Sequence, residues 1–220
     1  QVRMVGRSIG KRALVSFAKG YHACGGTDPE LLSLLRRKLL QRAHLWLEEH
    51  GLHPTPSLRS RYEHAIKEAT HEIVLVTPYF IPRRWLLAAI HTALIRGVRV
   101  TILIPEHTDV PWIDHLNRSS LATFHAIGAT CLRSPEMNHA KAMLIDRKRG
   151  LIGSHNLDAL SFDWNVESSL FFEEQHMVHD LSRIMDSWLA TAHPYDPTKE
   201  HMKFWEYPLR WVLMLFAPIL

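Results

Sequence analysis

The sequence is poor in the features that mark disulfide-bonded and membrane-spanning proteins. Its two cysteines, Cys24 and Cys131, form no CxxC pattern, so no pairing is deduced and a reducing cytosolic environment is the simpler interpretation. No stretch reaches the roughly 20 consecutive apolar residues of a transmembrane helix. The chain begins with Gln1 and has no signal-peptide layout, so we expect a fragment of a longer protein.

Acidic residues are missing from one part of the chain. Residues 1–27 contain no Asp or Glu but do contain basic side chains, namely Arg3, Arg7, Lys11, Arg12 and Lys19. Over all 220 residues the formal net charge is +4, which favours anionic partners such as phospholipid headgroups or nucleic acid. A hydrophobic content of 46% is sufficient for a packed core, and 22% charged residues argues against global disorder.

Residues 1–57 predict a basic lead-in and a helical segment. Asp28-Pro29-Glu30 supplies the capping residue, first-turn proline and acid of a helix start, and the apolar residues that follow predict a helix through Leu45-Trp46-Leu47 to Gly51. His53-Pro54-Thr55-Pro56-Ser57 is the best linker candidate. We therefore expect a catalytic half-domain at 58–192 and a C-terminal amphipathic tail at 193–220.

Helical and strand patterns alternate from residue 58 onwards. The periodicity predicts helices over 58–69, 85–95, 113–127 and 175–190, and strands over 73–76, 98–104, 129–132, 140–146, 151–153 and 166–172. Elements of these lengths in alternation imply an α/β fold with a mixed, mostly parallel sheet flanked by helices on both faces.

Polar residues in the second half of the chain have the spacing of a phosphate site. His139 and Lys141 are two residues apart, so on a strand they project from one face and place a nucleophilic imidazole beside an ammonium. Ser154 and Asn156 repeat this spacing and can donate to the same phosphate oxygens. A carboxylate on the far imidazole nitrogen would fix its tautomer, and Glu167 is our choice for that role, with a solvated strand charge as the alternative.

The pattern HxKx4Dx6GSxN, from His139 to Asn156, closely resembles the phospholipase D superfamily. Val76-Thr-Pro-Tyr-Phe80 looks like the family's lead-in to a second catalytic half, and the likeness is strongest to bacterial cardiolipin synthases over residues 58–192. Asp146, at the end of its predicted strand, could be catalytic or could tie a loop. The resemblance implies these site residues: His139 as nucleophile, Lys141 and Asn156 on the phosphate, Ser154 assisting, Glu167 orienting His139, and Asp146 mainly structural.

A second HxK motif is absent from the sequence. The family's mechanism needs two half-sites, because one histidine attacks phosphorus while another protonates the leaving alcohol. We expect a missing N-terminal half to supply the second site, with a homodimer partner as the alternative. An inactive, membrane-associated remnant is a third hypothesis.

Two classes of function follow from the resemblance. The favoured one is a phosphatidyltransferase of cardiolipin synthase type, acting on phospholipids at an anionic membrane surface, peripheral on the cytoplasmic face of a bacterial membrane. The other is a homodimeric phosphodiesterase or nuclease, and nucleic acid is the less expected partner. Tyr79-Phe80-Ile81 and the aromatic-rich stretch 204–216, an interfacial anchor or a helix docked on the core, favour lipid.

Neither a cofactor nor a metal is expected, because Lys141 and neutral donors would handle the charge on the phosphate. Glu173, Glu174, His176 and His179 could form a metal site. An acidic helix start with surface histidines is the preferred interpretation of that cluster.

Overall fold

The computed structural model describes residues 14–15, 17–18, 21–22, 24–34, 45–50, 57–163, 165 and 167–199, with the backbone alone at residues 32, 45–50 and 57. The predicted helix start is confirmed in α2 (Pro29–Leu34), where Asp28 Oδ1 accepts a hydrogen bond from the Leu31 N–H at 3.0 Å. The helix predicted through residues 45–47 is wrong, because Leu45–His50 form strand β1. The predicted linker, apart from Ser57, and residues 204–216 lie outside the described residues.

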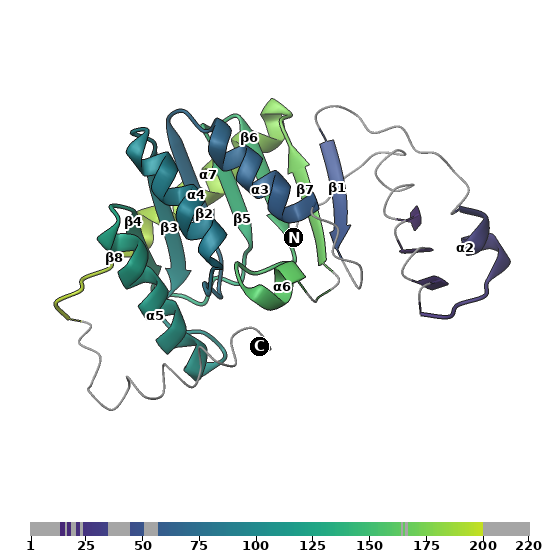
Figure 1. Ribbon diagram of the computed structural model, residues 1–220, viewed down its shortest axis with the longest axis horizontal. Helices are drawn as coiled ribbons and strands as arrows, with labels where there is room; N and C mark the ends of the chain where they lie inside the picture. Colours follow the sequence, from purple (N-terminus) through teal and green to yellow (C-terminus); the bar gives the residue numbers. More distant parts are fainter. Residues whose placement is uncertain are drawn as a thin grey trace.

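The strands of the described part of the chain form one eight-stranded sheet. They are β1 (Leu45–His50), β2 (Glu72–Val76), β3 (Arg99–Pro105), β4 (Thr130–Ser134), β5 (Ala142–Ile145), β6 (Arg149–Gly153), β7 (Glu167–Phe172) and β8 (His193–Pro194). Their order across the sheet is β1-β7-β6-β5-β2-β3-β4-β8 (Figure 1). Strands β5 and β6, which hold most of the predicted motif, therefore lie in the interior of the sheet and are not its outermost strands.

The α/β class and the mixed sheet are confirmed, but the expectation of a mostly parallel sheet is wrong. Among the described strands, β2–β3 and β3–β4 are the parallel pairs, and the other five pairs are antiparallel. A parallel pair needs a crossover of a dozen or more residues, whereas β5 and β6 are joined by a turn over residues 146–148. The short motif strands can therefore pair only as a hairpin.

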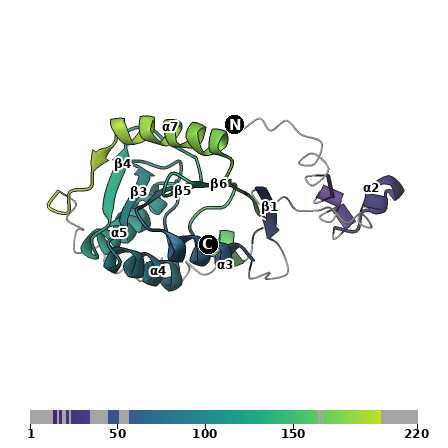
Figure 2. The same cartoon turned by 90° about the horizontal axis from the view of Figure 1, so that it is seen from above.

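Helices cover both faces of the sheet, as predicted (Figure 2). One face carries α3 (Ser57–Glu68), α4 (Arg84–Ile95) and α5 (Pro111–Ala126), and the other carries α7 (Gln175–Thr191). The short α6 (Ala159–Asp163) lies between β6 and β7 along the chain. The sheet, with α3, α4 and α5 on one face and α7 on the other, thus forms three layers.

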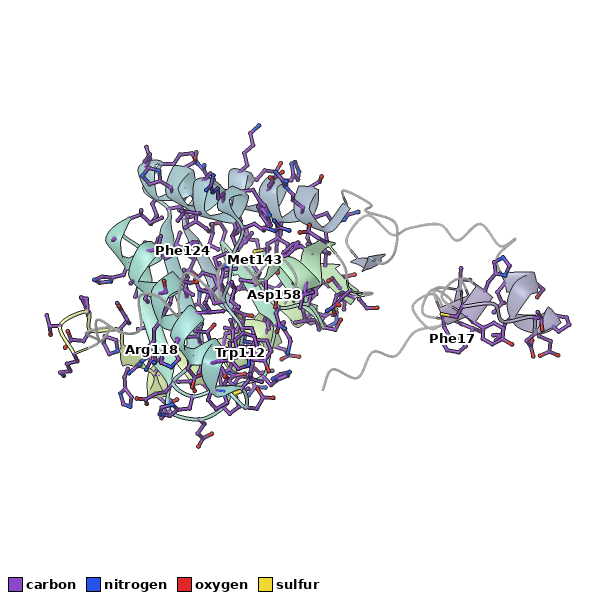
Figure 3. The ribbon with its side chains drawn as sticks, turned by 60° about the horizontal axis from the view of Figure 1, so that its bottom comes forward. Phe17, Trp112, Arg118, Phe124, Met143 and Asp158 are labelled. Atoms are coloured by element: carbon purple, nitrogen blue, oxygen red, sulfur yellow. The ribbon has the colours of Figure 1, made fainter. Side chains whose placement is uncertain are left out.

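Alternation along the central strands divides the core into two layers. Ile73 and Leu75 pack with α3, α4 and α5, whereas Val74 and Val76 pack with α7, because successive side chains of a strand point to opposite faces. Phe124, which is labelled in Figure 3, is buried in the first of these layers. Apolar residues on both faces of β2 make it a buried central strand.

The sheet extends beyond the expected limits of 58–192. On one side β1 pairs with β7 in the register Leu45↔Phe172 to His50↔Glu167. On the other side β8 pairs with β4, and the Tyr195 that follows it is 7% exposed. Strands from both flanking segments therefore complete the sheet, and the domain boundaries stay a prediction.

Candidate active site

The strand directions bring five segments of the chain to the same end of the central strands, and this end of the sheet is called the polar edge. β2 and β3 are parallel, so the segments after them leave at the same edge, where Tyr79 and Asp109 lie. β5 is antiparallel to β2, which places the start of β5, with Lys141, at that edge. The hairpin pairing then returns the end of β6 and the start of β7 to it, with Ser154 and Glu167.

His139 and Lys141 lie in the segment immediately before β5. The strand begins at Ala142, so the expected strand over 140–146 starts two residues too early. Lys141 Nζ donates to the His139 carbonyl at 3.0 Å, and the Lys141 carbonyl accepts from the Gly153 N–H at 3.0 Å. The structure therefore places the predicted nucleophile and cation side by side and ties them to the end of β6.

Burial and neighbouring charges act on the pKa values of both groups. Partial burial and the positive charge of Lys141 lower the pKa of His139, and the negative charge of Asp109 opposes them. The pKa of Lys141 is lowered by burial, against the attraction of Glu167, Asp109 and Asp158. A depressed pKa favours the neutral imidazole, which is the form that can act as a nucleophile.

Ser154 and Glu167 form a hydrogen-bonded pair across the β6–β7 edge. Ser154 Oγ donates to Glu167 Oε2 and accepts from the Ser168 N–H at 3.0 Å, and Asn165 Nδ2 donates to Glu167 Oε1 at 3.4 Å. Among the residues that the structure describes, no hydrogen bond or ion pair joins Glu167 to His139. Glu167 therefore contacts Ser154, and its negative charge acts on Lys141. That Glu167 orients His139 stays a prediction.

Asn156 lies between the polar edge and a buried carboxyl group. Its backbone N–H donates to Ser161 Oγ at 3.0 Å, and its side chain hydrogen-bonds Asp158. Asn156 Oδ1 is buried without a hydrogen-bond partner. An unpaired buried acceptor costs about 1–3 kcal/mol, so a hydrogen bond from a ligand or from solvent to Asn156 Oδ1 would be favourable.

Asp146 lies at the other end of β5, away from the polar edge. Its carboxylate accepts hydrogen bonds from the N–H groups of Thr70, His71 and Glu72 at 2.7–2.9 Å. Burial alone would raise the pKa of Asp146, but these donors lower it to about 2. These hydrogen bonds join the start of β2 to the end of β5, which favours the structural alternative for Asp146, and its part in catalysis stays a prediction.

Three acidic or phenolic groups at the edge were not assigned to the site from the sequence. Tyr79 Oη donates to Asp109 Oδ1 at 2.6 Å, and the Tyr79 ring meets the His139 ring edge-on with centroids 6.0 Å apart. Burial and the Asp109 contact raise the pKa of Tyr79 to about 12. Asp158, labelled in Figure 3, is 7% exposed, and burial raises its pKa. The place of these residues after strands β2, β3 and β6 was the available signal, since loops at one sheet edge meet.

Buried polar contacts hold the loops of this edge. Asn117, which is 1% exposed on α5, accepts from the Phe80 N–H at 2.7 Å and donates to the Pro78 carbonyl at 2.8 Å. His155 points away from its neighbours Ser154 and Asn156 into the core, where Tyr62 Oη and Ser169 Oγ each lie 2.8 Å from a ring nitrogen. These contacts hold the ring of His155 in the core.

Within the described ranges, no group of three or more His, Cys, Asp or Glu side chains is placed to hold a metal ion. Glu173, Glu174, His176 and His179 lie at the start of α7 and just before it, and their arrangement there gives the alternative metal site no support. Metal-independent chemistry stays a prediction.

Comparison with known proteins shows the family. The family model described as "Cardiolipin synthase, PLD-like domain" matches residues 62–189, more than half of the chain. Cardiolipin synthase A of Erwinia tasmaniensis is 29% identical over 158 residues, which make up 71% of this chain and 32% of that protein. The chain therefore spans about a third of the length of the curated relatives it matches.

Two solved structures share the fold. Nuc, a phospholipase D family member from Salmonella typhimurium, matches with a TM-score of 0.57 and 18% identity, over 69% of this chain and 98% of that one. Phosphatidylserine synthase from Haemophilus influenzae matches with a TM-score of 0.60 and 18% identity, over 80% of this chain and 46% of that one.

Proposed function

This chain belongs to the family of cardiolipin synthase phospholipase D-like domains, and we propose that it is one catalytic half of a phosphatidyltransferase of that type. The observation that supports this most directly is the topology of β5, β6 and β7. The segment before β5 with His139 and Lys141, the segment after β6 with Ser154 and Asn156, and the first residue of β7, Glu167, all lie at the same end of these strands. This set contains a nucleophile, a cation and neutral donors, which is what the displacement of an alcohol from a phosphodiester requires.

We infer a two-step displacement through a phosphohistidine. In the first step a ring nitrogen of His139 attacks phosphorus, the bond from phosphorus to the leaving alcohol breaks, and the second half-site protonates that alcohol. In the second step the acceptor hydroxyl gives up its proton to the second half-site and attacks phosphorus, and the P–N bond breaks. Lys141 and Asn156 hold the non-bridging oxygens in both steps, while Glu167 anchors Ser154.

The second half-site is proposed to come from the rest of a longer protein. The chain covers 32% of its curated relatives, which leaves room for a second domain of this size. A homodimer is the alternative. Phospholipids are the proposed substrates, at the cytoplasmic face of a bacterial membrane. Within the described part of the chain, no helix combines the length and hydrophobicity needed to cross a bilayer.

The test is a transfer assay with the complete protein in detergent-dispersed phosphatidylglycerol carrying a labelled phosphate. We expect labelled cardiolipin, free glycerol, and label on a histidine after rapid acid-free denaturation. His139→Ala should abolish product, while His179→Ala, a change at an exposed histidine on α7, should not. Efficient DNA cleavage without transfer between lipids would replace this proposal with the nuclease alternative.

A further inference from the structure

Asp109 and Tyr79 form a hydrogen-bonded pair next to His139, and the two residues lie on two loops outside the HxKx4Dx6GSxN motif. Asp109 follows β3 and Tyr79 follows β2, and their side chains meet in a hydrogen bond of 2.6 Å from Tyr79 Oη to Asp109 Oδ1. The Tyr79 ring stands perpendicular to the His139 ring, at 89°, with centroids 6.0 Å apart. The two contacts link the imidazole to a carboxylate through a phenol.

Other contacts hold the Tyr79 side of this pair in place. Thr77 Oγ1 donates to the Tyr79 carbonyl at 2.9 Å, and the Leu157 N–H donates to the same carbonyl at 3.3 Å. The amide of Asn117 fixes the residues on either side of Tyr79 by bonding Pro78 and Phe80. The phenol is therefore fixed by its own backbone, and it can hold an otherwise exposed carboxylate in one position.

We propose that Asp109 and Tyr79 are positioning residues for His139, in which the Tyr79 hydroxyl holds the Asp109 carboxylate where it stabilises the positively charged imidazole. This rests on the proposed function of His139 and assigns to Asp109 an electrostatic role that the motif alone would give to Glu167. A carboxylate near an imidazole favours its cationic form and so favours bond formation from a neutral ring that becomes positive.

The charged groups around His139 support this assignment. Lys141 lies on the same segment and disfavours a positive imidazole, whereas Asp109, from the β3–α5 loop, favours it. Tyr79 contacts the ring from the β2–α4 loop without a charge of its own, since its pKa is about 12. Glu167 from β7 and Asp158 from the β6–α6 loop act on Lys141 and are not among the charges that shift the pKa of His139.

The test is a pH titration of the His139 imidazole by NMR, with its signal among the 16 histidines identified by its loss in His139→Gln. Asp109→Asn should lower the titration midpoint by roughly 0.5–1 pH unit, because the attraction for the imidazolium is removed. Tyr79→Phe keeps the ring but frees the carboxylate, so it should lower the midpoint by a smaller amount. Glu136→Gln, a matched loss of an exposed carboxylate three residues before His139, should change it by less than about 0.2.

An unchanged midpoint in Asp109→Asn, or an equal change in Glu136→Gln, would overturn the proposal. An unchanged midpoint in Tyr79→Phe would overturn the claim that the hydroxyl holds the carboxylate. The titration needs no turnover, so its outcome is separate from failure of the proposed function, which would show as full activity in His139→Ala. In the complete protein, Asp109→Asn should also move the acidic limb of the kcat profile to lower pH and leave KM within about twofold.

Discussion

Asp146 and Glu167 illustrate how two carboxylates of one motif serve different purposes. Asp146 accepts hydrogen bonds from three successive backbone N–H groups at the start of β2. Glu167 receives the hydroxyl of Ser154 and the amide of Asn165 at the opposite edge. Both carboxylates accept hydrogen bonds from fixed donors, but of the two only Glu167 lies beside the proposed phosphate site, where it acts on the charge of Lys141.

Asp146→Asn should destabilise the protein by about 2–4 kcal/mol at pH 7, because an amide cannot replace a carboxylate that accepts several N–H groups. Chemical denaturation measures this change, and Asp180→Asn, an exposed carboxylate on α7, should stay within about 0.5 kcal/mol. A fully stable but inactive Asp146→Asn protein would favour the catalytic alternative for Asp146.

The pH dependence of stability should carry the signature of Asp146. Its pKa in the folded state is about 2, below the ordinary value near 3.9. The stabilisation is therefore complete above about pH 4 and is lost as the pH falls toward 2. Unfolding curves between pH 5 and 2 should show a steeper loss in the wild type than in Asp146→Asn, and parallel curves would contradict the account.

Glu167→Gln should lower kcat by about 10–100-fold with little change in KM, because the charge that favours the protonated Lys141 is removed while the side chain keeps its size. Steady-state kinetics of the complete protein checks this. Glu167→Asp should recover part of the loss if the charge is what matters. A larger effect on KM than on kcat would indicate that Glu167 serves mainly to bind substrate.

At the scale of elements, the edge of the sheet depends on α5 as well as on the strands. Asn117 satisfies one donor and one acceptor of the buried loop between β2 and α4. Asn117→Ala should therefore cost about 1–3 kcal/mol of unfolding free energy and reduce turnover, because two buried backbone groups lose their partner. Thr123→Ala, on the exposed side of the same helix, is the control and should change neither quantity measurably.

The spacing of apolar residues in the sequence predicted those helices and strands in which that spacing is regular. The helices α3, α4, α5 and α7 and the strands between them all lie within a few residues of their predicted bounds. β1 was missed because the short run Leu45-Trp46-Leu47 fits a helix or a strand equally well, and pairing with β7 decides between them. The site residues of the motif were predicted from their spacing. Asp109 was not, because it has no motif spacing, and its place after β3 is a signal only once β3 is paired in parallel with β2.

At the scale of the whole molecule, the proposed chemistry uses the charge of Lys141 in place of a metal ion. Activity of the complete protein should therefore survive dialysis against a chelator in detergent-dispersed substrate, within about twofold. Loss of activity that one divalent metal restores would favour the cluster at the start of α7 instead.

Membrane binding belongs to the same scale. Residues 204–220 are rich in aromatic and apolar side chains, and we expect them to add affinity for a bilayer surface. Their deletion should weaken sedimentation with anionic vesicles by roughly tenfold and leave hydrolysis of a soluble phosphodiester nearly unchanged. Equal loss of both would mean that this segment packs on the catalytic core.

The central claim, that this half-site performs phosphodiester chemistry through His139, is tested most directly by turnover of the complete protein with His139→Asn. The account predicts a fall in kcat of at least about 10³-fold with an unchanged unfolding midpoint. Within the described residues, the contacts of His139 are a hydrogen bond accepted by its carbonyl and an edge-on contact with the Tyr79 ring. Turnover within about tenfold of the wild type would contradict it.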